Sequence, residues 1–220
     1  MTTLPTRDYA AFLFDMDGTI LTSIIAAERV WAAWARSHGL DVDAFLPTIH
    51  GKRSIDTVRG AGLPNIDHEA EAHRITLAEI EDVEGIEAIA GVAAFLASLP
   101  VGRWAIVTSA PRKLAEARIA AAGLPMPPVL VAAEDVQRGK PAPDPFLLGA
   151  EKLGMRPEDC LVFEDTLAGL QSADAAGMDS VVVTATHRHP IETTVGGVPD
   201  YDALRVIVNQ DGLLRLHPHA

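Results

Sequence analysis

The chain has 220 residues, of which 48% are hydrophobic, and its mean hydropathy is +0.16. This composition supplies a sizeable core for one large domain or two modest ones, and it argues against disorder. The formal net charge of −12 argues against broad binding to nucleic acids or anionic membranes, which requires a basic face. A small anionic ligand remains compatible, because a lysine and a metal ion can reverse the charge inside a pocket.

Neither a signal peptide nor a transmembrane helix is indicated, so we expect a cytoplasmic protein without a membrane partner. The most apolar stretch, 88–102, is short and is interrupted by Gly91, Ser98 and Pro100. Cys160 is the only cysteine, which excludes an intrachain disulfide. It precedes an apolar run, so we expect a buried, unreactive thiol.

The first predicted strand, 11–14, leads directly into Asp15-Met16-Asp17-Gly18-Thr19. Residues two apart on a strand share a face, which brings two carboxylates together at the strand end. At about 4 Å and an effective dielectric near 20, two such charges repel by roughly 4 kcal/mol. We interpret the pair as a site for a cation or for a reaction that needs both groups. The alternative for this motif alone is a turn capped by aspartates.

The next seventy residues contain no convincing strand but carry helical patterns at 23–38, 54–59 and 67–82. In the first of these, Trp31 and Trp34 fall on one apolar face, which indicates a small helical core. We therefore predict an all-α cap domain over residues 22–87, inserted into an α/β core made of residues 1–21 and 88–220. Two hinge strands are expected near Leu21 and within 85–91.

The rest of the chain alternates short apolar runs with amphipathic patterns. Strands are predicted at 104–108, 129–132, 161–164 and 180–184, and helices at 92–99, 112–122, 145–153 and 167–176. Continuous apolar runs are typical of parallel strands buried on both faces. The fold class is therefore α/β, with a doubly wound, mostly parallel sheet and a Rossmann-like core. The tail, 205–216, predicts a short β-hairpin at the sheet edge.

Polar motifs follow several of these strands. The second strand ends at Thr108-Ser109, Gly139-Lys140-Pro141 lies in the segment after the third strand, and the fourth strand ends at Glu164-Asp165. Taken singly, each has an ordinary explanation as a helix cap, a solvated charge or a loop. Ligands of open parallel sheets bind outside the carboxyl ends of the strands, so their gathering at one edge with Asp15 and Asp17 indicates a site.

These four motifs, in this order, resemble those of the haloacid dehalogenase (HAD) superfamily over nearly the whole chain. The helical insertion resembles the cap of its β-phosphoglucomutase-like branch. Within that branch, the segments 30–40, 49–52 and 104–109 are similar to those of bacterial sugar- and polyol-phosphate phosphatases. The chain departs from the branch pattern at Thr22, where Asp is usual, and at Ala110, where a polar residue is frequent. We expect altered hinge geometry and altered substrate contacts there.

The resemblance implies a phosphoric monoester hydrolase that acts on a small-molecule phosphate ester. Asp15 is expected to be the nucleophile that forms an aspartyl phosphate, and Asp17 the general acid and base. The remaining phosphate-binding candidates are Gly18, Thr108, Ser109 and Lys140. Gly18 lets the backbone approach the phosphoryl oxygens, and Lys140 neutralises their charge.

The crowded carboxylates and a phosphate dianion together exceed the charge that one lysine can balance. A hard divalent cation with oxygen ligands is therefore expected, and Mg²⁺ fits best. By resemblance, its ligands are the side chains of Asp15 and Asp165 and the backbone carbonyl of Asp17. Glu164 is expected to support these ligands rather than to bind the metal.

The cap loop that contains His50 and Lys52 is the candidate for contacting the substrate body. The alternative is an ordinary solvated basic loop. Two other functions stay open: a β-phosphoglucomutase-like mutase and a non-enzymatic phospho-accepting switch. We expect no nucleic-acid partner and a monomer or weak homodimer.

Overall fold

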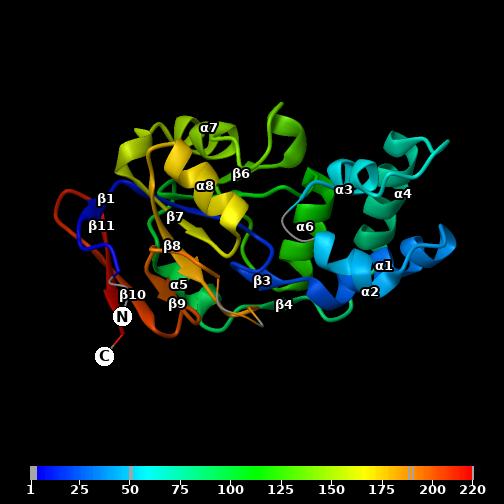
Figure 1. Cartoon of the computed structure of the whole chain (residues 1–220). Helices are drawn as coiled ribbons and strands as arrows, with labels where there is room; N and C mark the ends of the chain where they lie inside the picture. Colours follow the sequence, from blue (N-terminus) through cyan, green and yellow to red (C-terminus); the bar gives the residue numbers. More distant parts are fainter. Residues whose placement is uncertain (1–3, 50–51, 188, 190, 220) are drawn as a thin grey trace.

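The computed structural model describes residues 4–49, 52–187, 189 and 191–219. Its centre is a six-stranded sheet whose strand pairs are all parallel (Figure 1). In spatial order its strands are β6 (Val129–Val131), β5 (Trp104–Val107), β2 (Ala11–Phe14), β7 (Cys160–Glu164), β8 (Asp179–Val183) and β9 (Gly197–Val198). This confirms the predicted doubly wound α/β fold. β9 was not predicted from the sequence.

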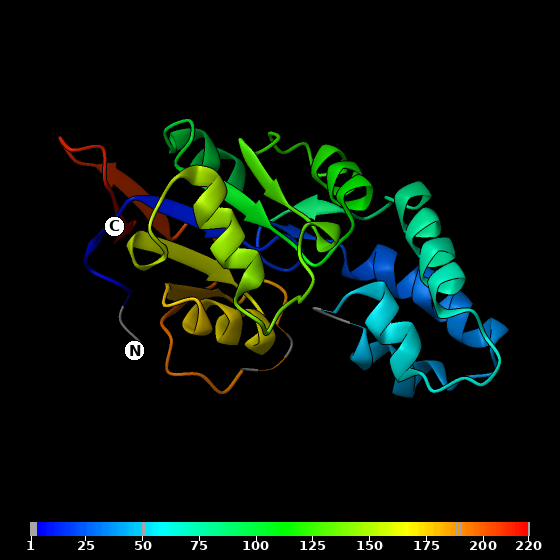
Figure 2. The ribbon, with the colours of Figure 1, turned by 90° about the horizontal axis from the view of Figure 1, so that it is seen from above.

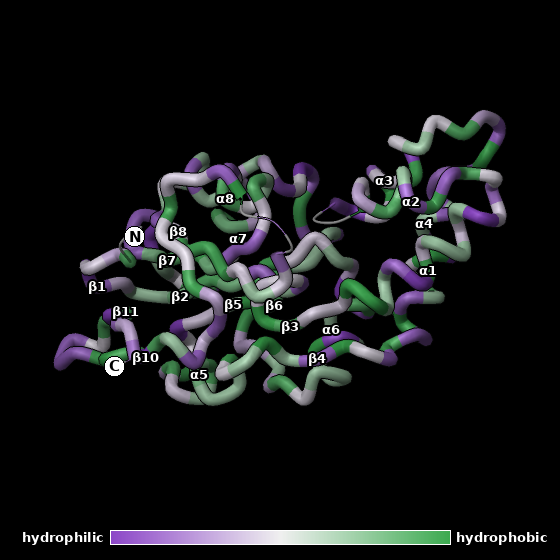
Figure 3. The backbone as a smooth tube through the Cα atoms, turned by 60° about the horizontal axis from the view of Figure 1, so that its bottom comes forward, coloured by the Kyte–Doolittle hydropathy of each residue, from purple (hydrophilic) through white to green (hydrophobic). Residues whose placement is uncertain are grey.

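The two faces of the sheet are covered by different helices. On β2, Phe12 and Phe14 face a cluster completed by α5 (Val92–Ser98) and α6 (Arg112–Ala121). Leu13, between them, faces a cluster completed by α7 (Asp144–Leu153) and α8 (Leu167–Ala175). Successive strand residues point to opposite faces, and helices cover both faces, so every residue of β2 is buried. Figure 3 shows the hydrophobic character of these central strands.

The helices α1 (Ile24–Ser37), α2 (Val42–Phe45), α3 (Ser54–Gly60) and α4 (His68–Glu81) lie together beyond one end of the sheet (Figure 2). They share an apolar cluster that includes Trp31 and Trp34, and the indole of Trp34 donates to Glu71 at 2.9 Å. The unpredicted α2 begins where Asp41 accepts hydrogen bonds from two backbone N–H groups. The 3₁₀ turn Leu46–Thr48 follows it. The assignment of residues 22–87 as a separate domain stays a prediction.

Two short strands carry the chain into and out of this helical segment. β3 (Leu21–Thr22) pairs antiparallel with β4 (Glu87–Ala88), in the register Leu21 to Ala88. Strands are therefore present at both expected places, and their role as hinges stays a prediction. Thr22, the residue that departs from the branch pattern, lies in one of them.

The tail forms the predicted hairpin but in a different place. β10 (Leu204–Val208) and β11 (Leu214–Pro218) pair antiparallel, and β1 (Asp8–Tyr9) adds to β11. The expected position at the edge of the main sheet was wrong, because β1 and the hairpin form a second, three-stranded sheet. Asp8 stabilises it by accepting from Arg215 at 2.5 Å and from Asn209 at 3.0 Å. Two further 3₁₀ turns span Ala133–Asp135 and Pro157–Asp159.

Candidate active site

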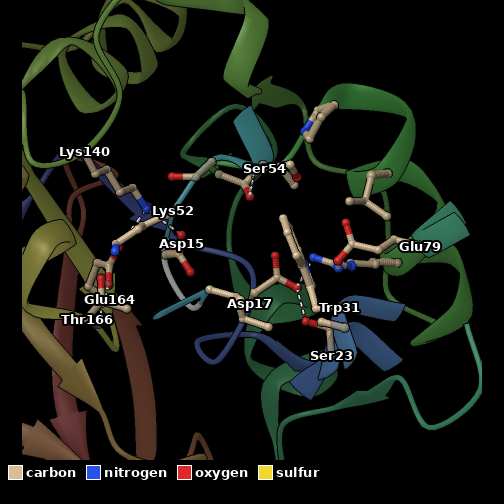
Figure 4. A pocket seen from close by; sticks show the side chains of 18 residues that line it. Asp15, Asp17, Ser23, Trp31, Lys52, Ser54, Glu79, Lys140, Glu164 and Thr166 are labelled. Carbon is tan, nitrogen blue, oxygen red and sulfur yellow. Dashed lines mark hydrogen bonds and ion pairs between the residues drawn. The ribbon is translucent and has the colours of Figure 1, made fainter. Parts of the chain in front are cut away.

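The predicted motifs meet at the carboxyl edge of the sheet, on the side of helices α1–α4. A cavity of about 90 Å³ lies there. Its walls hold most of the predicted residues: Asp15, Asp17, Lys52, Thr108, Ser109, Lys140 and Glu164 (Figure 4). Gly18 and Asp165 border an adjacent hollow that also reaches Asp17. His50 lies outside the described residues.

Lys140 places a buried positive charge beside Asp15. Its Nζ donates to Asp15 at 2.5 Å and to Glu164 at 2.7 Å. A third bond, to the carbonyl of Val107 at 3.1 Å, ties the lysine to the end of β5. Burial alone would lower the pKa of Lys140, but the two carboxylates outweigh it and hold the pKa above its ordinary value. Lys140 therefore stays charged beside the proposed nucleophile.

Three carboxylates form a group that fits a metal ion. One oxygen from each of Asp15, Glu164 and Asp165 lies within 4.8 Å of the others. Burial, with repulsion from Glu164, raises the pKa of Asp15 to about 8 despite Lys140. Burial, with repulsion from Glu164 and Asp15, raises the pKa of Asp165 well above its ordinary value. Repulsion between carboxylates this close disfavours the state in which all of them are ionised. A divalent cation that binds their oxygens offsets this repulsion.

Glu164 is occupied by protein donors. One of its oxygens accepts from Lys140, and the other accepts from the backbone N–H groups of Asp165 and Thr166 at 2.8 and 2.7 Å. The hydroxyl of Thr166 also donates to it, at 2.9 Å. These bonds hold the loop that carries Asp165. That Glu164 supports the metal ligands rather than binding the metal stays a prediction.

Gly18 and Thr108 are two of the predicted phosphate-binding residues. Gly18 has φ +89° and lies against the carboxylate of Asp165, where a β carbon would leave no room. The hydroxyl oxygen of Thr108 accepts from the N–H of Ala110 at 3.0 Å. Its proton therefore remains for an acceptor such as a phosphoryl oxygen.

The side chain of Asp17 faces away from the three-carboxylate group. Its Oδ1 accepts from the hydroxyl of Ser23 at 2.5 Å and pairs with Arg118 Nη1 at 2.9 Å (Figure 4 shows Ser23 beside it). Asp17 thus borders the same cavity as Asp15 and Glu164 but lies outside the group of three carboxylates that fits a metal ion. The physical reason is a buried guanidinium, which attracts the nearest carboxylate more strongly than a cluster of like charges does.

Arg118 and Glu79 are the residues that the sequence analysis missed. Arg118, on α6, pairs through Nη2 with Glu79, on α4, at 2.9 Å. Burial, together with the charge of Asp17, raises the pKa of Glu79 despite Arg118. A signal was present, because Arg118 follows Leu114 by four residues and Glu79 follows Ile75 by four. Both charges therefore fall on apolar helix faces.

The comparison with protein families decides the classification. A sequence profile described as haloacid dehalogenase-like hydrolase matches residues 9–177. The chain belongs to this family. Among curated proteins, hexitol phosphatase A of Escherichia coli (strain K12) is 47% identical over 178 residues, covering 79% of this chain and 82% of that protein. Fructose-1-phosphate phosphatase YqaB of the same strain is 34% identical, covering 80% and 96%.

Solved structures agree on the fold of this family member. β-Phosphoglucomutase from Clostridium difficile superimposes with a TM-score of 0.74 at 22% identity, covering 90% of this chain and 93% of that one. At this identity the likeness concerns the fold alone. Across the described residues, no helix is both long and apolar enough to span a bilayer.

Proposed function

We propose that this chain is a Mg²⁺-dependent phosphatase of small phosphorylated sugars or polyols that forms an aspartyl phosphate on Asp15. The observation that carries the proposal is the buried Asp15 carboxylate, bound to Lys140 and within the group that fits a metal ion. The relatives described above are phosphatases by name, which confirms the prediction of a phosphoric monoester hydrolase. Their names also support a sugar or polyol phosphate as the substrate.

In the first step, an oxygen of Asp15 forms a bond to phosphorus while the bond from phosphorus to the ester oxygen breaks. Lys140 keeps the attacking carboxylate and the phosphoryl oxygens neutralised. Asp17 gives its proton to the departing oxygen, so the alcohol leaves uncharged. For this, its side chain has to turn from Arg118 toward the ester oxygen.

In the second step, a water molecule attacks the phosphorus of the aspartyl phosphate. Asp17 takes the proton of this water, and the bond from phosphorus to Asp15 breaks. Inorganic phosphate and the free carboxylate of Asp15 result. The hydroxyl of Thr108 and the backbone N–H of Ser109 are proposed to hold phosphoryl oxygens in both steps.

The metal ion would be held by the carboxylates of Asp15 and Asp165 and by the backbone carbonyl of Asp17. When bound, Mg²⁺ supplies positive charge that stabilises the phosphoryl group and the nucleophile together.

A moving cap is part of the proposal. Ligand pockets usually span about 300–1,000 Å³, and the cavity of 90 Å³ by itself leaves too little room for a sugar phosphate. The adjacent hollow at Gly18 and Asp165 is larger, about 830 Å³, and a shift of helices α1–α4 relative to the sheet would join the two spaces for substrate entry. The return of these helices excludes water during phosphoryl transfer. Lys52, an exposed residue at the cavity, is proposed to contact the substrate body.

Product analysis tests the proposal. The protein is incubated with Mg²⁺ and a panel of hexitol phosphates, fructose 1-phosphate and glycerol 1-phosphate, and released phosphate is measured. Mass spectrometry of acid-quenched protein then locates a phosphoryl group on the peptide that contains Asp15. An isomerised sugar phosphate without phosphate release would instead identify a mutase. A phosphoprotein that persists for hours without turnover would identify a switch.

A further inference from the structure

One nitrogen of the Arg118 side chain has no hydrogen-bond partner among the residues that the structure describes. The side chain is 7% exposed, and two of its three nitrogens pair with carboxylates, Nη1 with Asp17 and Nη2 with Glu79. Its Nε is buried and has no hydrogen-bond partner among the described residues. A buried donor left unpaired costs roughly 1–3 kcal/mol, so this N–H is suited to an acceptor that arrives with a ligand.

The residues around this nitrogen are suited to bind a hydroxyl group of a ligand. Arg118 and Glu79 both line the cavity, together with the ring of Trp31. Burial raises the pKa of the Glu79 carboxyl group, and the Trp31 side chain also acts on Glu79 and lowers that pKa. A carboxylate offers about four acceptor positions, so Glu79 can accept a further hydrogen bond besides that from Arg118. A side chain with an unpaired donor and one with a free acceptor position therefore border the same cavity, and Figure 4 shows Glu79 and Trp31 at it.

The contact with Asp17 indicates which hydroxyl would be bound. Under the proposed function, Asp17 delivers a proton to the oxygen that links phosphorus to the substrate carbon. Arg118 pairs with Asp17 at 2.9 Å before that carboxylate turns toward the ester oxygen. The space that the Asp17 carboxylate leaves beside Arg118 then lies next to the ester oxygen, where a group on the carbon adjacent to the phosphate-bearing carbon would be placed.

Resting on the proposed function, we propose that Arg118 and Glu79 recognise a free hydroxyl on the carbon adjacent to the phosphate-bearing carbon. Nε of Arg118 donates to the hydroxyl oxygen, and the Glu79 carboxylate accepts the hydroxyl proton. The preferred substrates are open-chain polyol phosphates and 2-ketose 1-phosphates in their cyclic form. Pyranose 6-phosphates are disfavoured, because the oxygen on their adjacent carbon is a ring ether that cannot donate.

A matched pair of substrates tests this assignment. Glycerol 1-phosphate carries the adjacent hydroxyl, and 3-hydroxypropyl phosphate lacks only that group. We expect kcat/KM of the wild-type protein with Mg²⁺ to favour glycerol 1-phosphate roughly 10- to 100-fold, as for a hydrogen bond to a charged group. Glu79→Gln and Arg118→Lys are expected to reduce this ratio about tenfold. Glu81→Gln, an exposed position on the same helix, is the control and keeps the ratio.

The ratio of the two kcat/KM values distinguishes a loss of hydroxyl recognition from a general folding defect. A purely structural defect slows both substrates equally, and an unchanged ratio in both variants would overturn the assignment. A wild-type ratio near one overturns it without any variant, whether or not the variants fold. Phosphate release from both substrates without preference refutes only this inference. No release from any ester in the panel refutes the proposed function as well.

Discussion

Gly18 and Asp165 lie so close that a β carbon at position 18 would meet Oδ2 of Asp165 at 2.0 Å. The two residues come from different strand ends, 147 positions apart, and the backbone of the first leaves the space that the carboxylate of the second occupies. Gly18 therefore has two roles at the proposed metal site. It adopts the positive φ that the turn requires, and its missing side chain leaves room for the Asp165 carboxylate.

Gly18→Ala is expected to displace the Asp165 carboxylate and to weaken Mg²⁺ binding roughly 10- to 100-fold, comparable with the loss of a residue that orients a metal ligand. Isothermal titration calorimetry measures this. Gly102→Ala is the matched control, because Gly102 has φ +82° but its added β carbon meets nothing within 4 Å. In both variants, holding an alanine at positive φ destabilises the fold by about 1–2 kcal/mol. Equal Mg²⁺ affinities in the two variants would refute the role of the close approach.

The stability of the metal-free protein is expected to fall as the pH rises from about 4 to about 8. The pKa of Asp15 is near 3.8 ordinarily and about 8 in the fold, so in this range the folded state binds more protons than the unfolded state. Unfolding free energy decreases with pH under that condition. Urea titrations in EDTA at several pH values measure the slope. Asp15→Asn should flatten it, and an unchanged slope would contradict the assignment.

Mg²⁺ is expected to stabilise the protein more at pH 8 than at pH 5.5, because protons compete with the metal for the carboxylates. At a concentration one hundred times the dissociation constant, binding contributes about 2.7 kcal/mol. For a chain of this size that corresponds to a rise in Tm of roughly 5–10 °C. Thermal scans with and without Mg²⁺ measure the rise. A rise that Asp165→Asn leaves intact would show that the metal binds elsewhere.

Asp15→Asn is expected to abolish phosphate release, and Asp17→Asn to lower kcat about 10²- to 10⁴-fold. The first change replaces the nucleophilic carboxylate by a neutral amide, and the second removes the proton donor. Phosphate release is measured alongside circular dichroism, because the folded structure should persist in both. Retained turnover in the Asp15 variant would refute its role as nucleophile.

Cys160 is expected to resist thiol reagents in the folded protein. Burial raises the pKa of its thiol to about 12, and the charges of Asp159 and Glu158 add to this. The reactive thiolate is therefore scarce at pH 8. Labelling with a disulfide reagent should proceed only after urea is added, with one thiol per chain. Rapid labelling in native buffer would contradict the burial.

Much of the site was predictable because parallel strands end at one edge. Asp15, Thr108 and Glu164 each follow or end an apolar run, and the order of these runs is enough to place them together. The position of the C-terminal hairpin was not predictable in this way. It depends on β1, a strand of two residues whose sequence carries no periodic signal.

The sequence by itself determined the α/β fold and the gathering of carboxylates and a lysine at the sheet edge, since hydrophobic runs and polar strand ends are local patterns. Only the tertiary structure decided which way Asp17 faces. That direction depends on Arg118 and Glu79, which lie 39 residues apart on α6 and α4. Their pairing arises where two helices pack, and no local pattern specifies which side chains meet there.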